Sequence, residues 1–222
     1  MTFAPYSYSK LSCFESCPMM FKLRYIDKAK PSENPQYFKR GLNIHRELEN
    51  YPNCSPDFKE SFSQRKIGVK YDSIMNGEVR HEVRLGLDEN LNITSYYDKA
   101  NVIKGIIDMI YIKDGVVHLV DWKTGKIPHE LNWDQLAIYA VAFLDKYDVN
   151  VSYVYVDADV EMSKTFKMSE RDDLVQRFKG KINAVESCES FDRNISWKCE
   201  FCQFKHICCP DNHGLEHSII NI

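Results

Sequence analysis

The sequence predicts one α/β domain in which helices flank a mixed central β-sheet. Two β-branched runs, at 102–112 and 116–122, are separated by an Asp-Gly pair, which indicates an antiparallel hairpin. Segments before and after the hairpin carry apolar residues at helical spacing. With 222 residues, of which 44% are apolar and 27% charged, the chain can bury one sizeable core. We expect a single domain over residues 1–222, with its core at 41–186.

The N-terminal region predicts two helices. Ser9 or Ser12 is expected to cap the first helix, which carries Cys17, Phe21 and Tyr25 at helical spacing. After a proline-containing loop at 29–37, a second helix is expected at 38–51, and residues 52–76 are expected to be helical in part. In the second helix Leu42, His45 and Leu48 share one face, so His45 is expected to point inward. A histidine on an apolar face is often a core residue, and that reading stays open.

The remaining elements surround the hairpin. Alternating and β-branched runs predict strands, and 3.6-residue periodicity predicts helices. The expected elements are a strand at 77–87, a crossover helix at 133–146, a strand at 151–156, and a final helix opened by a Ser169-Asp172 capping box and ending near Cys188.

The hairpin brings two carboxylates together. An Asp-Gly pair at 114–115 suits a two-residue turn, because both central positions need positive φ. If Lys113 pairs with Val116, the register places Asp108 directly opposite Asp121, with β-carbons about 4.5 to 5.5 Å apart. A three-residue loop, which glycine also permits, would shift this register.

Other groups on the second strand complete a candidate metal site. Lys123 faces the same side as Asp121, whereas Trp122 points away and leaves its carbonyl near that side. Opposed carboxylates repel unless a cation lies between them, and carboxylate and carbonyl oxygens suit Mg²⁺ or Mn²⁺. Such ions activate water and polarise phosphodiesters. The alternative is a solvated hairpin whose polar face carries Asp108, Asp121 and Lys123 without a metal.

The C-terminal region carries a second candidate metal site. Cys199, Cys202 and Cys208 offer three thiolates within ten residues, and a fourth ligand is needed. Eight cysteines in 222 residues are too few for a disulfide scaffold. Four thiolates would suit zinc or a [4Fe-4S] cluster, and free thiols remain possible. Candidates for the fourth ligand are Cys17, Cys13, Cys209, His206 and His213, whereas Cys54 and Cys188 are expected to be spectators.

Taken in order, these segments resemble the PD-(D/E)XK nuclease superfamily. The resemblance is to its RecB-like branch, which includes the AddB nuclease domain and the fourth CRISPR-associated (Cas) exonuclease, and it covers about residues 6–210. Glu82 resembles an acid found before the metal-binding hairpin, although an ordinary strand residue is an equal reading. The matching motifs are Gly105-x-x-Asp108, Asp121-x-Lys123-Thr124-Gly125-Lys126, Gly41-x-x-x-His45, Gln135-Leu136-x-x-Tyr139, and the cysteine frame of the iron-sulfur members.

The resemblance implies a restriction-endonuclease-like fold and a catalytic Mg²⁺ or Mn²⁺ ion. Asp108, Asp121, the Trp122 carbonyl and His45 would hold the metal, and Lys123 would position water. Gln135 and Tyr139 would contact DNA or brace the catalytic residues. Cys17 would be the fourth ligand of a structural [4Fe-4S] cluster, with zinc as the alternative. This cluster would join residues 1–40 to residues 190–210.

The implied activity is a DNA exonuclease on single-stranded or frayed ends. Recombination or repair, bacteriophage DNA metabolism and CRISPR adaptation are the settings of such proteins, and partners in nuclease or adaptation complexes are expected. The alternative is a DNA-end-binding subunit with little activity of its own, or a zinc-stabilised DNA-binding protein.

Charge and hydropathy bear on the partner and the compartment. Residues 1–46 carry eight Lys or Arg against three Asp or Glu, in a chain of net charge −3. This basic region could hold a phosphate backbone, and its aromatic residues could stack on bases or belong to the core. No apolar stretch approaches the length of a membrane span, and the first residues lack a secretory h-region. We therefore expect a cytoplasmic protein.

Overall fold

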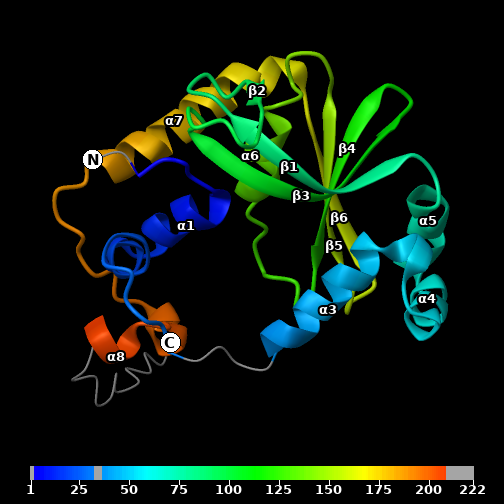
Figure 1. Cartoon of the computed structure of the whole chain (residues 1–222), viewed down its shortest axis with the longest axis horizontal. Coiled ribbons are helices and arrows are strands. Elements are labelled where there is room, and N and C mark those ends of the chain that lie inside the picture. Colours follow the sequence, from blue (N-terminus) through cyan, green and yellow to red (C-terminus); the bar gives the residue numbers. More distant parts are fainter. Residues whose placement is uncertain (1–2, 33–36, 209–222) are drawn as a thin grey trace, which may run out of the picture.

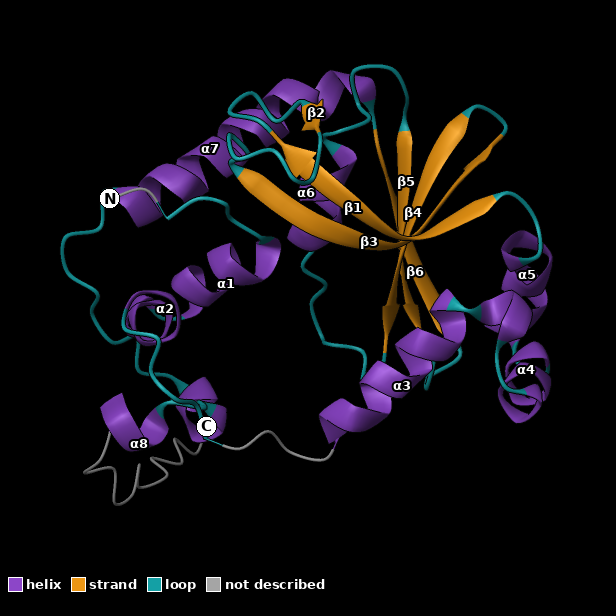
Figure 2. Cartoon of the chain, viewed as in Figure 1, coloured by secondary structure: helices purple, strands orange, loops and turns teal. Residues whose placement is uncertain are grey.

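The computed structural model describes residues 3–32 and 37–208. Its centre is a six-stranded mixed sheet with the strand order β2-β1-β3-β4-β5-β6 (Figures 1 and 2). This confirms the predicted mixed α/β architecture with flanking helices. The strands are β1 (Val79–Leu87), β2 (Ile93–Thr94), β3 (Ile103–Lys113), β4 (Val116–Lys123), β5 (Val149–Tyr155) and β6 (Val160–Phe166).

The β3–β4 hairpin has the predicted turn. The φ values of Asp114 and Gly115 are 52° and 75°. Both are positive, as a two-residue hairpin turn with two left-handed positions requires. Lys113 pairs with Val116, so the predicted register is correct as far as Met109 and Val120. Strand β5 then runs parallel to β4, and the crossover between them contains a helix. Strand β6, which was not predicted, pairs antiparallel with β5 at the sheet edge.

Helices cover both faces of the sheet. Helices α1, α6 and α7 lie on one face, and α3, α4 and α5 lie at the other side of the molecule (Figure 1). The helices are α1 (Tyr8–Ser16), α2 (Pro18–Phe21), α3 (Tyr37–Glu49), α4 (Pro56–Ser63), α5 (Lys66–Met75), α6 (Asp134–Ala140), α7 (Arg171–Glu186) and α8 (Lys205–Cys208). No helix in the described part of the chain is both long and apolar enough to cross a membrane.

The predicted first helix was wrong in two respects. Its cap is Ser7, whose hydroxyl accepts the Lys10 backbone N–H at 3.2 Å, rather than Ser9 or Ser12. The helix also ends before Cys17, which has an extended backbone, because the following Pro18 has no N–H to continue the pattern. A π-helical turn at Lys22–Ile26 follows α2.

Two other boundaries and the exposure of one side chain differ from the prediction. Helix α6 stops at Ala140, where an irregular run of turns replaces the rest of the expected helix. The N-cap of α7 is Glu170 rather than Ser169, and it makes no side-chain cap hydrogen bond; the Glu170 carboxylate instead accepts the Lys167 backbone N–H at 2.7 Å, which caps the 3-10 turn Met168–Glu170. Leu42 was expected to face inward with His45 but is 66% exposed, because α3 contacts the sheet only with its C-terminal part.

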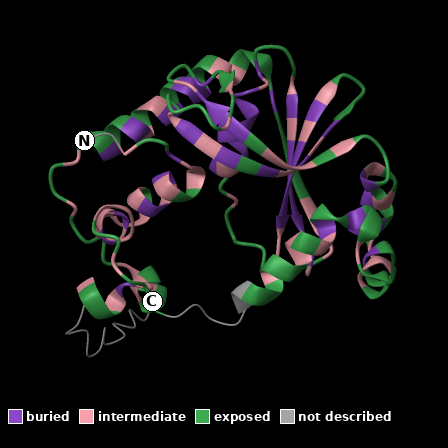
Figure 3. Ribbon diagram, viewed as in Figure 1, coloured by how far each residue is buried: buried purple, intermediate pink, exposed green. Residues whose placement is uncertain are grey.

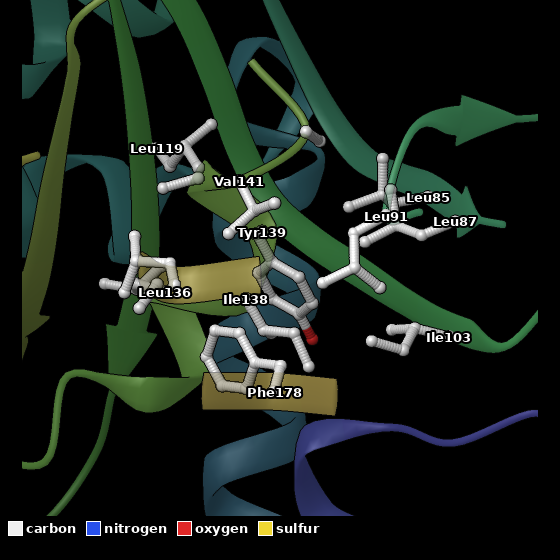
Figure 4. Packing of buried hydrophobic residues seen from close by; sticks show 14 of the residues in the cluster. Leu85, Leu87, Leu91, Ile103, Leu119, Leu136, Ile138, Tyr139, Val141 and Phe178 are labelled. Carbon is white, nitrogen blue, oxygen red and sulfur yellow. The ribbon is translucent and has the colours of Figure 1, made fainter. Parts of the chain in front are cut away.

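The buried residues form two clusters, one on each face of the sheet. The larger cluster, packed under α1, α6 and α7, includes Leu119, Leu136 and Phe178 (Figure 4). Ile107 belongs to the same cluster. The smaller cluster lies under α3, α4 and α5 and is centred on Trp122. Tyr6 and Phe21 are fully buried in the larger cluster and Tyr8, Phe14 and Tyr25 pack against it, so the N-terminal aromatic residues belong to the core.

Candidate active site between β3 and β4

Strands β3 and β4 part at the two carboxylates. Their pairing ends at Met109 and Val120, so Asp108 and Asp121, although next in register, are not a hydrogen-bonded pair. Instead the Asp108 carboxylate accepts the Trp122 backbone N–H at 2.8 Å. On its other side Asp108 faces Glu82 of β1, which has a left-handed φ of 49° and interrupts the pairing between these strands. Asp108 thus lies where the pairing of β3 with both neighbouring strands is interrupted.

Asp121 is held by two side chains. Its exposed fraction is only 5%. The Lys123 ammonium lies 2.7 Å from one carboxylate oxygen, and the Gln135 side-chain amide of α6 donates to the other. Lys123 also donates to the Gln135 carbonyl at 2.8 Å, which closes a three-membered network. The sheet and the crossover helix therefore supply complementary parts of one polar site.

Helix α3 brings His45 to the same place. The imidazole Nδ1 is 3.5 Å from the Asp108 carboxylate. A cavity of about 570 Å³ opens beside it, and its lining includes Glu82, on the neighbouring strand. The structure thus brings His45, Asp108, Asp121, Lys123 and Gln135 together, as the sequence predicted.

Burial dominates the electrostatics of this site. It raises the pKa of Asp108 to about 8, with a further contribution from the negative charge of Asp121, whereas the Trp122 N–H acts in the opposite direction. Burial also raises the pKa of Asp121, against the effect of Lys123. It lowers the pKa of His45, against the effect of Asp121, so a neutral imidazole is favoured. A cation between these groups would relieve the cost of ionising the two carboxyls.

The glycines of the site make room for other motif residues. A β-carbon on Gly105 would lie 2.3 Å from the ring of Tyr139, which is buried against this strand (Figure 4). On Gly41 it would lie 3.0 Å from the Thr124 hydroxyl. The phenol of Tyr139 has a raised pKa, caused first by burial and then by Asp121 and Asp108, so it stays protonated beside them.

The carboxylates of Asp108 and Asp121 and the imidazole of His45 are ligands that suit a hard divalent ion, although these side chains do not converge on a common point. Within residues 3–32 and 37–208, no three His, Cys, Asp or Glu side chains converge in a ready-made metal site. Asp121 Oδ2 nevertheless is buried and accepts no well-directed hydrogen bond from the described residues, despite the nearby ammonium. A buried carboxylate oxygen of this kind, beside a second carboxylate and an imidazole, is the chemistry that Mg²⁺ and Mn²⁺ bind.

Sequence reasoning missed Arg40 and Asp157, which form an ion pair beside the site. Asp157 follows the end of β5 and accepts the Gly125 N–H at 2.9 Å. Because β4 and β5 are parallel, their carboxyl ends lie side by side, so an acid after β5 is placed next to the turn after Lys123. That relation was not accessible before the parallel pairing was known.

The model of the PD-(D/E)XK nuclease superfamily matches residues 5–209. The chain belongs to this superfamily. PD-(D/E)XK nucleases use divalent metals such as Mg²⁺ or Mn²⁺ and act on DNA, so the family indicates metal-dependent nuclease activity. A comparison with curated proteins found no match. Among solved structures, one titled "Crystal structure of SSO0001" is 17% identical, with a TM-score of 0.45, and the match covers 90% of this chain and 84% of that chain.

The four predicted cluster cysteines of this PD-(D/E)XK chain line one cavity. Cys17, Cys199, Cys202 and Cys208 all border a space of about 500 Å³ between the N- and C-terminal segments. The Asn194 backbone N–H points to the Cys17 sulfur, and the Ser196 N–H to the Cys199 sulfur, each at 3.5 Å. Of the alternative ligands, Cys13 is buried and its pKa is raised to about 11, chiefly by burial. Cys209 and His213 lie outside the described residues.

Contacts between protein groups already join the two segments around this cavity. Arg24 donates to the Gln203 side chain at 2.8 Å, and the Ser32 N–H donates to the Gln203 carbonyl at 2.9 Å. Phe191 stacks on Phe21 with a centroid distance of 6.1 Å. These contacts place the described N-terminal segment, residues 3–32, beside residues 191–203.

Proposed function

We propose that the chain is a Mg²⁺- or Mn²⁺-dependent deoxyribonuclease that removes nucleotides from single-stranded or frayed DNA ends. One observation carries this proposal: a buried carboxylate, a partly buried carboxylate, a lysine and a histidine meet where β3 and β4 part. A structural role would not require Asp108 to lie beside the buried Asp121 carboxylate, because the two negative charges repel each other. We place the activity in DNA recombination or repair, bacteriophage DNA metabolism or CRISPR adaptation, as the motif resemblance implies.

Four groups would hold the ion. They are the carboxylates of Asp108 and Asp121, the imidazole of His45 and the backbone carbonyl of Trp122. When bound, Mg²⁺ or Mn²⁺ supplies Lewis-acid polarisation of the phosphodiester and lowers the pKa of an attacking water. Neutral His45 suits ligation, because only its unprotonated nitrogen can donate to a metal.

The protein's own groups orient the reaction. Lys123, already in contact with Asp121 and Gln135, is placed to position the water and to offset negative charge on the phosphate. Gln135 fixes the direction of both side chains. Tyr139 is buried against Gly105, so we assign it to bracing the strand that carries Asp108 rather than to contacting DNA.

Degradation of end-labelled single-stranded DNA with Mn²⁺ tests the proposal. Wild-type protein, purified without oxygen, is compared with Asp121→Asn, which keeps the volume of the side chain but removes its charge. Lys164→Ala, on the distant edge strand, serves as the control. We expect cleavage by wild type and control and loss of cleavage in Asp121→Asn; the position of the label then gives the polarity of digestion.

The second candidate is a DNA-end-binding subunit with little activity of its own. It is favoured by the contact between Lys123 and Asp121, which neutralises a carboxylate that a metal would need. Wild-type protein that binds DNA ends but cleaves with neither Mn²⁺ nor Mg²⁺ would support this candidate over the nuclease.

We further propose that Cys17, Cys199, Cys202 and Cys208 hold a structural [4Fe-4S] cluster, with zinc as the alternative. Their shared cavity and the N–H groups directed at two sulfurs support a thiolate site. Iron, sulfide and zinc analysis of anaerobic protein, with the visible absorption spectrum, distinguishes these metals. Cys199→Ser is expected to lose metal and to melt at lower temperature, whereas Cys188→Ser, outside the site, is expected to lose neither. Cys199→Ser protein that keeps its metal and melting temperature would contradict the assignment.

A further inference from the structure

In the half of the β1–β3 ladder that pairs residues 83–87 with residues 103–107, one face of the sheet is not covered by helices. In this half of the ladder Leu85 and Ile107 are buried in the larger cluster, whereas Arg84 and Ile106, which are cross-strand partners, are exposed. Figure 3 shows buried and exposed positions along these strands. Figure 1 shows that α3, α4 and α5 lie near the opposite end of β1 and β3. Since cross-strand partners point to the same side, Arg84 and Ile106 share the open face.

Two tyrosines and two cations gather on this face. The Arg84 guanidinium lies 5.8 Å from the ring centre of Tyr96 and 6.0 Å from that of Tyr97, and Arg84 also donates to the Tyr97 hydroxyl. Lys104 lies 5.2 Å from the Tyr96 ring. Tyr97 is 72% exposed. Neither Arg84 nor Lys104 forms a salt bridge within the described ranges.

Three residues of the open face, Arg84, Lys104 and Ile106, lie on the two strands that carry Asp108 and Glu82. Ile106 is two residues from Asp108, and Lys104 is four residues away, or about 13 Å along a strand. On β1, Arg84 is two residues from Glu82, which lines the cavity beside His45.

We propose that Arg84, Tyr96, Tyr97, Lys104 and Ile106 form a track that binds single-stranded DNA next to the site. Exposed aromatic rings stack on unpaired bases, and arginine and lysine contact the phosphates between them. A paired duplex would hide the base faces that these rings need, so the occupant is a single strand. The inference rests on the proposed nuclease function, because it assigns the segment of substrate that extends from the scissile phosphate.

Binding of a labelled oligo-dT strand without divalent metal tests the track directly. Tyr97→Ala is expected to raise the dissociation constant about tenfold, since base stacking is worth about 1–3 kcal/mol and 1.4 kcal/mol is tenfold. Tyr97→Phe keeps the ring and should bind like wild type. Arg84→Gln should weaken binding and reduce its salt dependence by about one released counterion. Tyr147→Ala and Lys164→Ala, at exposed positions elsewhere, should bind like wild type.

Three outcomes separate failure of the track from failure of the nuclease. Hydrolysis of bis-p-nitrophenyl phosphate, which is too small to reach the track, should be the same in Tyr97→Ala as in wild type. Wild-type affinity of Tyr97→Ala for oligo-dT would overturn the track and leave the nuclease untouched. Equal weakening for oligo-dT and for a blunt duplex would also overturn it, because stacking requires unpaired bases. If wild type hydrolyses neither substrate, the nuclease proposal fails, and the binding measurements still decide the track.

Discussion

Arg40 of helix α3 forms a two-pronged ion pair with Asp157, with nitrogen–oxygen distances of 2.8 and 2.6 Å. The same aspartate accepts the N–H of Gly125, two residues after Lys123. One carboxylate therefore connects the helix that carries His45 to the turn that follows Lys123. Arg40 lowers the pKa of Asp157, chiefly through this hydrogen bonding, so the connection is ionised at neutral pH.

Asp157→Asn is expected to lower the rate of DNA cleavage more than it lowers stability. The ion pair is largely exposed and contributes at most about 1 kcal/mol to folding, yet its loss frees α3 to move relative to Lys123. Steady-state kinetics and thermal melting measure the two effects. Asp27→Asn breaks another exposed pair, with Lys22, and should change neither quantity appreciably. A rate loss that only follows the loss of folded protein would argue against a positioning role.

Gln135→Ala should reduce cleavage about 10- to 100-fold with little change in folding, because supporting hydrogen bonds around metal sites have effects of this size. The amide bridges Asp121 and Lys123, and both lose orientation without it. Gln135→Glu keeps the shape but adds a carboxylate beside Asp121, which should move the pH optimum upward. Unchanged activity in Gln135→Ala, measured on end-labelled DNA, would contradict this role.

In metal-free protein, Asp108 should make stability fall as pH rises from about 4 to about 8. Its pKa is about 8 in the folded protein against an ordinary value of 3.8, so the folded state binds the proton more tightly. Ionising the buried carboxyl then costs on the order of a few kcal/mol. Denaturation in EDTA at several pH values should show a smaller decline for Asp108→Asn than for wild type. Mn²⁺ should restore stability to wild type at high pH, and parallel pH profiles would refute the assignment.

Gly105→Ala should destabilise the fold by about 1–3 kcal/mol, the usual effect of overpacking. The new methyl group would overlap the ring of Tyr139, which the larger cluster holds in place. Gly180→Ala in α7 is a matched control, since a β-carbon there meets open space and alanine favours a helix by about 1 kcal/mol. Chemical denaturation should therefore show opposite signs for the two variants. Equal stability of Gly105→Ala and wild type would mean that Tyr139 can move aside.

The sequence by itself determined the hairpin, its turn and its register. Asp114 and Gly115 permit the left-handed conformations that set which residues face one another, so the approach of Asp108 to Asp121 follows from local chemistry. Helical periodicity likewise predicted α3 and the placement of His45. These features depend on neighbours in the chain, and a single sequence contains that information.

Tertiary structure decided how the site opens. The strands part at Asp108 because its carboxylate takes the Trp122 N–H and Glu82 adopts a left-handed backbone, which no local pattern indicates. Leu42 is exposed because only part of α3 meets the sheet, and the contact between Arg40 and Asp157 needs the parallel pairing of β4 with β5. These outcomes depend on groups far apart in the chain, whose packing energies local periodicity does not contain.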